Sequence, residues 1–429
     1  MGTLNLLQST SFLDFAVDKI GMVNLNWIGK IIQWLIEGVG IIGLGVVLFT
    51  LILKTVVLPL DVYSRVKTKK QALVMEKMRP QMEKLQKQYA NDKQMYSQKV
   101  MELQKQNGYS MLGACLPMIV SLVIFMLVFS AFSTYSQYAN LNTYNNMVDS
   151  YNASVQTYVL KDKDGNTVHE DGFLIETVDV SLGDKAYFVD FASFENYYKN
   201  DPLTADKPLA ENFSALKESE KQVYVKNYVR EHARKSAADY YRKNKNNFLW
   251  VKNIWYPDSL LNKEIPNFSK FSSAVSRATG SANDASYEEY YNEVTYYLRN
   301  HGYENSSGKI EGKVFNGYFV LIVLAIGLMF LQQFIMMRSQ KATNELGTVD
   351  GSGAKTNKWM MILMPIIYGV FSFFYSAAFS IYMITNTAFS LITTVVINKI
   401  LDACYKKYGD EFLRKKPKKG ANNRKRLKR

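Results

Sequence analysis

A single charged residue interrupts a long apolar stretch near the amino terminus. Residues 38–60 carry no charged side chain except Lys54, and about 23 residues at 1.5 Å each are enough to cross a ~30 Å hydrocarbon core. Lys54 precedes the end of this stretch by six residues, so it lies roughly 9 Å inside it. A cation at the centre of a bilayer costs about 2.5 kcal/mol or more. Two interpretations stay open: the ammonium extends to the lipid headgroups, or it faces a water-filled cavity among the helices.

The other residue types that do chemistry form no catalytic pattern in this sequence. The three histidines lack metal-ligand spacing, and two cysteines, Cys115 and Cys404, do not suggest a disulfide framework. The sequence contains no nucleophile elbow, phosphate-binding loop or dinucleotide motif. We therefore expect no catalytic residues, no metal and no cofactor, and we predict that the protein is not an enzyme.

The apolar residues are gathered into blocks, although the mean hydropathy of −0.15 is that of a soluble chain. Charge-free runs cover 106–148, 314–337 and 359–398. The last run would be roughly 60 Å long as one helix, about twice the hydrocarbon thickness, so we expect it to fold back near Tyr375. The sequence thus predicts five transmembrane helices, at 38–60, 110–133, 314–337, 359–375 and 379–398.

The net charge of +14 is unevenly distributed and predicts the topology. Residues 55–110 hold eleven basic and five acidic residues, and 359–429 hold thirteen and three. Residues 111–313 hold 21 basic and 25 acidic residues. Because short segments rich in Lys and Arg stay in the cytoplasm, we expect the amino terminus outside and the carboxyl terminus in the cytoplasm.

The segments between the spans have distinct patterns. Residues 1–37 form an extracellular segment with an interfacial helix at 24–37, held by Trp27 and Trp34. Residues 61–109 predict a cytoplasmic helical hairpin that turns at 90–92. Its seam contains Met75, Met78 and Met82. They form either the hairpin's own core or an adaptable surface for apolar segments.

An insert at 134–313 follows the second span. Residues 155–180 alternate around Asp164-Gly165-Asn166, a hairpin signal, and helical patterns cover 214–245 and 287–299. Residues 338–358 form a cytoplasmic loop. The predicted fold is therefore an all-α polytopic membrane protein with five transmembrane helices, a cytoplasmic helical hairpin and an inserted α+β extracellular domain.

The cytoplasmic tail, 399–429, ends in a basic run. It favours contact with solvent or anionic lipids, and the alternative is contact with RNA phosphates. The candidate contact residues are Lys415, Lys416, Lys418, Lys419, Arg424, Lys425 and Arg426.

The order of these features resembles the YidC membrane protein insertases, bacterial relatives of the mitochondrial and chloroplast insertases. The resemblance rests on a basic residue in span one followed by Leu58-Pro59-Leu60, on the hairpin sequence at 75–94 and on Gly113 to Pro117. It extends to 247–258, before span three, and to Met364-Pro365 in span four. A large insert between spans two and three is a departure from the family pattern.

The resemblance implies a multi-pass protein of the bacterial cell membrane with a hydrophilic groove in the inner leaflet. Lys54 stands where the family usually has arginine, and Tyr382 occupies the position of a substrate-contacting aromatic. Gln332 or Gln333 would line the groove. The hairpin, including Met75, Met78, Arg79 and Met82, would recruit substrates. The implied partners are nascent membrane proteins, the ribosome, the Sec translocon, signal-recognition targeting components and anionic lipids.

The leading functional hypothesis is a membrane protein insertase and chaperone, acting alone or with the Sec translocon. The alternative is a solute transporter or channel, which would favour polar residues through both leaflets and an internal repeat. A third class, a membrane-anchored enzyme or receptor, would place its activity in 134–313.

Overall fold

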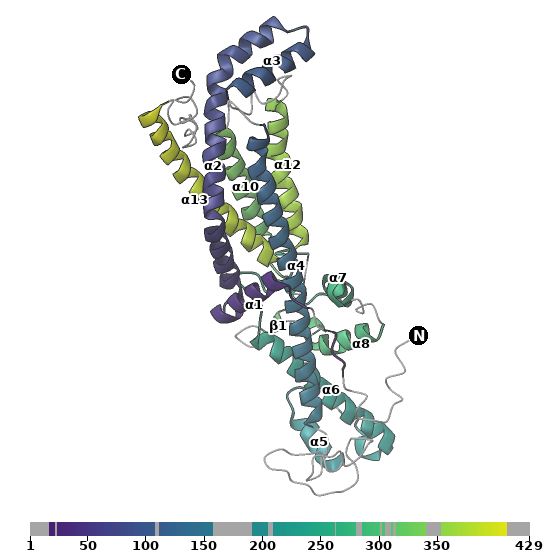
Figure 1. Ribbon diagram of the computed structural model, residues 1–429. Coiled ribbons are helices and arrows are strands. Elements are labelled where there is room, and N and C mark those ends of the chain that lie inside the picture. Colours follow the sequence, from purple (N-terminus) through teal and green to yellow (C-terminus); the bar gives the residue numbers. More distant parts are fainter. Residues whose placement is uncertain are drawn as a thin grey trace. The chain divides into compact units, whose positions relative to one another are not determined.

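The structure is a computed structural model that describes residues 17–21, 24–107, 111–157, 191–204, 209–261, 263–279, 285–300, 303–304, 310–311, 315–339 and 353–409. The chain folds into two compact units (Figure 1). We call residues 30–132, 256–258 and 319–429 the bundle unit, and residues 1–29, 133–255 and 259–318 the insert unit.

Long helices make up the bundle unit (Figure 1). They are α1 (Trp27–Val39), α2 (Ile42–Gln88), α3 (Lys93–Gln106), the first half of α4 (Met111–Gln156), α10 (Val320–Ser339), α12 (Gly353–Phe374) and α13 (Ala377–Tyr408). Helix α13 packs against both α2 and α10, and α10 packs against α12. Phe125 and Phe129 of α4 contact Tyr368, Phe371 and Phe379 of α12 and α13 at ring-centroid distances of 5.3–6.1 Å.

Three of the described helices are long and apolar enough to cross a membrane: α2, α10 and α13. Helix α13 contains the whole predicted fifth span, 379–398. Helices α2 and α10 hold most of the predicted first and third spans but begin four and six residues later than predicted, at Ile42 and Val320. The predicted second and fourth spans fall on α4 and α12, and their membrane crossing stays a prediction. The chain leaves the helical conformation at Tyr375 and Ser376, where the last apolar run was expected to fold back.

The short segment 256–258 fixes the starts of two of these helices. The backbone N–H of Ala377, the first residue of α13, donates to the Tyr256 carbonyl at 2.9 Å. The N–H of Leu321 in the first turn of α10 donates to Asp258 Oδ2 at 2.8 Å. A carboxylate at this position satisfies an otherwise unpaired N–H group and complements the helix dipole. Asp258 is fully buried, so its role is to hold α10 in place.

Helix α2 continues through the predicted boundary between span one and the hairpin. It contains Pro59 and Pro80 and is roughly 70 Å long. It begins after a sharp reversal at Gly40, whose φ of +72° suits a glycine. A Cβ atom on Gly45 would lie 2.9 Å from Ile36, so α1 approaches α2 closely at this point.

The methionine seam forms the core of the hairpin. Met75, Met78 and Met82 are buried in a cluster with Tyr96 and Val100 of α3. The chain turns between Gln88 and Lys93, and Asp92 caps α3 by accepting a 2.9 Å bond from the Met95 N–H. Of the two interpretations of these methionines, the structure supports the one in which they are the hairpin's own core.

Helices also dominate the described part of the insert unit. Helix α4 runs on to Gln156 and packs with α6 (Glu218–Lys243). The remaining elements are α5 (Phe191–Asn200), η3 (Phe213–Ala215), α7 (Phe268–Thr279), α8 (Ala285–Val294), α9 (Tyr296–Asn300) and the antiparallel strands β1 (Tyr303–Glu304) and β2 (Ile310–Glu311). The predicted hairpin at Asp164-Gly165-Asn166 lies outside the described residues, so the α+β prediction stays open.

Two kinds of polar contact tie the insert unit together. Asn145 and Asn152 on α4 each exchange two hydrogen bonds with the backbone of the segment 17–20, at 2.8–3.1 Å. Glu293 of α8 accepts from Arg234 of α6 at 2.6 Å and from the Tyr151 hydroxyl of α4 at 3.0 Å. Both sets join segments that are far apart in the sequence.

We expect Met78→Ala to destabilise the hairpin by about 2–5 kcal/mol, because it removes a buried side chain from a small core. Hydrogen exchange of the α3 amides would measure the effect as lost protection. Met101→Ala is the matched control, since Met101 lies exposed on α3. Equal loss of protection in the two variants would contradict the assignment of the methionines to the core.

Candidate functional site: a polar seam between two helices

Polar residues lie on one face of α13, within a run that carries no charge. Thr387, Ser390 and Thr394 are three and four residues apart, which places them on the same helix face. All three are buried. The facing helix α2 carries Lys54, with Asp61, Arg65 and Lys69 at intervals of seven and four residues. We call the contact between these two faces the polar seam.

Two cations of α2 converge on Ser390. The Lys54 Nζ donates to the Ser390 hydroxyl at 3.2 Å, and the Arg65 guanidinium lies 3.5 Å from the Ser390 carbonyl oxygen. Eleven residues separate the two along α2, roughly 16 Å. Their side chains must therefore extend toward one another to reach the same residue. Arg65 also donates to the Thr394 hydroxyl.

The seam has more positive than negative charge. Asp61 accepts from Arg65 at 3.0 Å, one turn away on α2, and Lys69 pairs with Asp402 of α13 at 2.9 Å. Lys54 has no carboxylate within ion-pair distance in the described part of the chain. The Ser390 hydroxyl is a neutral partner, so the charge of Lys54 is not balanced by a direct contact.

One hydroxyl of the seam has no partner among the described residues. The Thr387 Oγ1 is buried and forms no hydrogen bond there, and the whole residue is 1% exposed. Buried polar groups are nearly always bonded to protein or to ordered water. Because Thr387 lies one turn from Ser390, this hydroxyl indicates a place for water or for a polar group of a bound molecule beside Lys54.

Of the remaining predicted groove residues, two lie on a neighbouring helix and one lies on α13 itself. Gln332 and Gln333 are half-buried on α10, which packs against α13. Tyr382 is 3% exposed, and its ring contacts Phe132 and Phe379 at 5.4 and 6.0 Å. The structure therefore places Tyr382 in the aromatic core of the bundle unit, two turns along α13 from Ser390.

Of the predicted recruitment residues, the three methionines are buried in the hairpin core, and only Arg79 is partly exposed. Arg79 is half-buried on α2, beside the buried methionines. The predicted tail contacts, Lys415 to Arg426, lie outside the described residues.

Sequence reasoning missed Arg65, Asp61, Ser390 and Thr394 as site residues. Arg65 was counted only as part of the cytoplasmic charge that sets the topology. The hydroxyl residues of α13 did carry a signal, since their three-and-four spacing predicts one polar face on an apolar helix. The sequence held no information on which helix that face meets.

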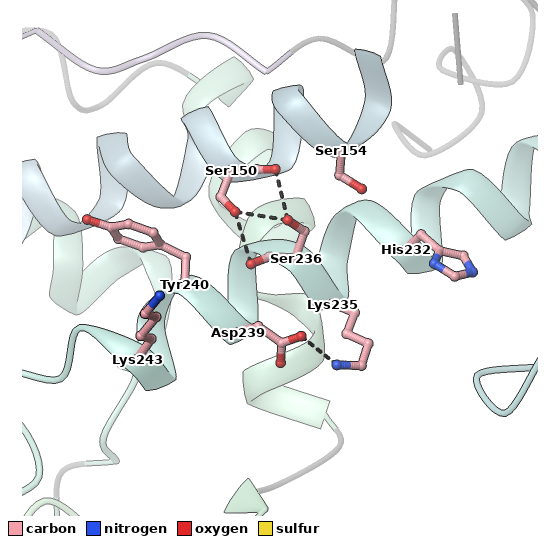
Figure 2. A pocket seen from close by; sticks show the side chains of 8 residues that line it. All are labelled: Ser150, Ser154, His232, Lys235, Ser236, Asp239, Tyr240 and Lys243. Carbon is pink, nitrogen blue, oxygen red and sulfur yellow. Dashed lines mark hydrogen bonds and ion pairs between the residues drawn. The ribbon is translucent and has the colours of Figure 1, made fainter. Parts of the chain in front are cut away.

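A cavity of about 430 Å³ lies in the insert unit, between α4 and α6 (Figure 2). Its walls include Ser150 and Ser236, whose hydroxyls are 2.9 Å apart, and an ion pair between Lys235 and Asp239. The two serines are bonded to each other, and His232 of the same lining is bonded to Asp201 outside it. It offers no arrangement typical of a catalytic site.

Comparison with known proteins decides the family. The sequence profile of the family described as 60Kd inner membrane protein matches residues 34–163 and 234–404, more than half of the chain. The chain belongs to this family. Membership of the 60Kd inner membrane protein family and the long apolar helices together identify a membrane protein. The family profile leaves residues 164–233 unmatched, so it accounts for both ends of the insert but not for its middle.

Relatives that are each named Membrane protein insertase YidC match shorter parts of the chain. The protein of Fusobacterium nucleatum is 38% identical over 91 residues, 21% of this chain and 42% of that protein. That of Leptospira interrogans is 37% identical over 94 residues, 21% and 14% of the two chains. That of Caldanaerobacter subterraneus is 26% identical over 113 residues, 26% and 53%. The chain spans about half or less of the length of these relatives, and no solved structure is similar to it.

We expect Arg65→Met to lower stability by about 1.5–3 kcal/mol, because it removes charged hydrogen bonds that join α2 to α13. The measurement is the unfolding temperature of the purified protein in detergent. Lys399→Met is the control, since Lys399 is exposed on α13, and we expect its effect to stay within about 0.5 kcal/mol. Equal shifts in the two variants would show that the Arg65 contacts do not hold the seam together.

Proposed function

We propose that the protein is a membrane protein insertase and chaperone that moves nascent membrane proteins into the bilayer, alone or with the Sec translocon. Family membership and the printed name of its relatives support the class of activity. The observation that carries the proposal is Lys54, held by a neutral hydroxyl inside an apolar span and without a carboxylate partner among the described residues.

The physical problem for an insertase is that polar groups lose water when they cross hydrocarbon. A polar group without a compensating hydrogen bond costs several kcal/mol in an apolar medium. We propose that the polar seam borders a hydrated groove in the inner leaflet, which shortens the apolar path. The hydroxyls of Thr387, Ser390 and Thr394 supply hydrogen-bond partners along its wall.

The contact between Lys54 and Ser390 suits a cation that changes partner. A neutral hydroxyl holds the ammonium in position, while a carboxylate forms a shorter and stronger charge-assisted bond. An acidic residue of the passenger would therefore displace Ser390. Unit charges 4 Å apart attract by about 1 kcal/mol in water and about 4 kcal/mol at an effective dielectric of 20. A hydrated groove lies between these limits, so the contact is favourable yet reversible.

The other parts of the chain take supporting roles in this proposal. The hairpin and the basic tail lie in the cytoplasm, where they meet the ribosome, signal-recognition targeting components and anionic lipids. Either Gln332 or Gln333 lines the path that the passenger follows, and Tyr382 supports the groove wall. Insertion moves a passenger segment from water into lipid and changes no covalent bond, so the proposal requires no metal or cofactor.

We expect the charge of Lys54 to matter more than its shape. Lys54→Arg should support insertion, Lys54→Ala should fail for passengers with acidic external segments, and Lys54→Glu should be the most defective because it repels them. Passengers without acidic residues should be less affected. The measurement is membrane insertion of matched acidic and neutral passengers in an insertase-depleted bacterium at equal protein levels. Equal insertion of both passengers by Lys54→Ala would show that the lysine is only a membrane anchor.

We expect the hairpin and the tail to be cytoplasmic and the insert unit to be extracellular. Single cysteines at Lys93→Cys, Asn200→Cys and Gly420→Cys test this with a membrane-impermeant maleimide on intact cells. Only the Asn200 site should react before the cells are opened, and all three should react afterwards. Reaction of the Lys93 site in intact cells would overturn the proposed orientation.

A further inference from the structure

Exposed apolar side chains of the insert unit gather in three short segments. Apart from Trp27 and Val223, the large apolar residues that the described part of this unit exposes lie at 249, 260–261 and 315–318. Leu249 is 66% and Leu261 67% exposed. We call residues 248–253, 259–261 and 315–318 the apolar loops. An exposed cluster of this kind marks a surface that meets another molecule or a membrane.

Hydrogen bonds from one asparagine side chain and from the backbone hold these loops together. The buried side chain of Asn316 accepts from the Asn253 N–H at 2.7 Å and donates to the Asn253 carbonyl at 2.9 Å. The Lys252 N–H donates to the Asn316 carbonyl at 3.2 Å. On the other side, Phe315 pairs with Lys263 in an antiparallel bridge. The segment 315–316 therefore fixes both leucine-bearing loops close to itself.

The place of this segment in the chain indicates what covers the loops. Tyr318 precedes Val320 by two residues, and Val320 begins α10, one of the helices able to cross a membrane. Residues 315–318 must therefore lie at the membrane surface on the side where α10 begins. The hydrogen bonds bring Leu249 and Leu261 to the same surface. The exposed Lys263 stands two residues from Leu261, as suits contact with anionic headgroups.

The backbone at Leu249 supplies an independent observation. Leu249 and Phe319 are the non-glycine residues with positive φ in the described part of the chain, at +54° and +63°. The ring of Phe319 stacks on that of Phe373 at 5.9 Å, so this side chain has a partner within the fold. Leu249 stands at the tip of the turn between Phe248 and Val251, where glycine or asparagine is usual. An exposed leucine in a strained position indicates a role outside the fold itself.

We propose that the tips of the apolar loops, Leu249 and Leu261, insert into the lipid surface beside the point where α10 enters the membrane. Leucine side chains bury apolar area in the interface, and the neighbouring Trp250 and Tyr318 suit the headgroup level. The loops thereby anchor the insert unit to the bilayer through a contact that is independent of the polar seam and of insertase activity.

The test uses the full chain with both cysteines replaced by serine. A fluorophore is attached at Leu249→Cys or Leu261→Cys, and the protein is reconstituted into vesicles of phosphatidylcholine and phosphatidylglycerol that contain brominated phosphatidylcholine. Val223→Cys is the matched control, because Val223 is an exposed apolar residue of α6 in the same unit. Val323→Cys, exposed on α10, shows the quenching expected of a lipid-facing site.

Brominated lipid should quench the probes at 249 and 261 several-fold more than the probe at 223. Bromines near the glycerol backbone should quench more strongly than bromines near the chain ends, because the loops lie in the interface. Quenching at 249 and 261 that is no greater than at 223, with clear quenching at 323, would overturn the proposal and assign the loops to contact with protein.

Discussion

A lysine inside an apolar span must be solvated, and the partner of Lys54 in this structure is the Ser390 hydroxyl, 3.2 Å from its Nζ. Several features of the bundle unit depend on this requirement. Helix α13 must present a polar face within an uncharged run, and α2 must pack along that face. Arg65 and Lys69 extend the contact toward the hairpin through Thr394 and Asp402. The same groups that solvate the lysine thus hold the two helices together.

Different contacts stabilise the insert unit. Its described part has a tyrosine-rich core with an ion-pair network around Glu293, and its amino-terminal segment is bonded to α4 by two asparagines. The family profile covers 134–163 and 234–313 of this region but leaves 164–233 unmatched. The unmatched segment holds α5, η3 and the amino-terminal part of α6, up to residue 233. The part of the chain that the family does not account for is therefore narrower than the whole insert.

Periodicity and charge predicted much of the helical framework, because both can be recognised within one segment of the sequence without knowing which segments pack together. The apolar runs of α10 and α13, the turn of the hairpin and the reversal near Tyr375 all follow from local composition. The continuation of α4 to Gln156 was not predicted, because residues 134–156 form no apolar run. Their helical signal is weaker: Leu141, Tyr144, Val148 and Tyr151 recur every three or four residues. The fate of the methionines was left between two alternatives, because a seam on one helix does not reveal whether α3 covers it.

The site was harder to predict than the framework for a similar reason. The sequence singled out Lys54 because a charged residue inside an apolar span is unfavourable in free energy. Its partner in the structure, Ser390, lies more than 300 residues away along the chain. Spacing predicts a face of a helix but not the helix that it meets. Tyr382 illustrates the same point, because its position on α13 gave no indication that Phe132 and Phe379 enclose its ring.

The proposed mechanism requires that water reaches the polar seam beside Lys54. The most direct measurement compares Lys54→Cys with Val56→Cys, two α2 positions that differ in depth by about 3 Å, using a charged, membrane-impermeant thiol reagent on opened membrane vesicles. Lys54 is half-buried in the seam, whereas Val56 is exposed on the surface of α2. We expect the cysteine at 54 to react and the cysteine at 56 to stay unreactive in lipid. A cysteine at 54 as unreactive as the one at 56 would contradict this mechanism.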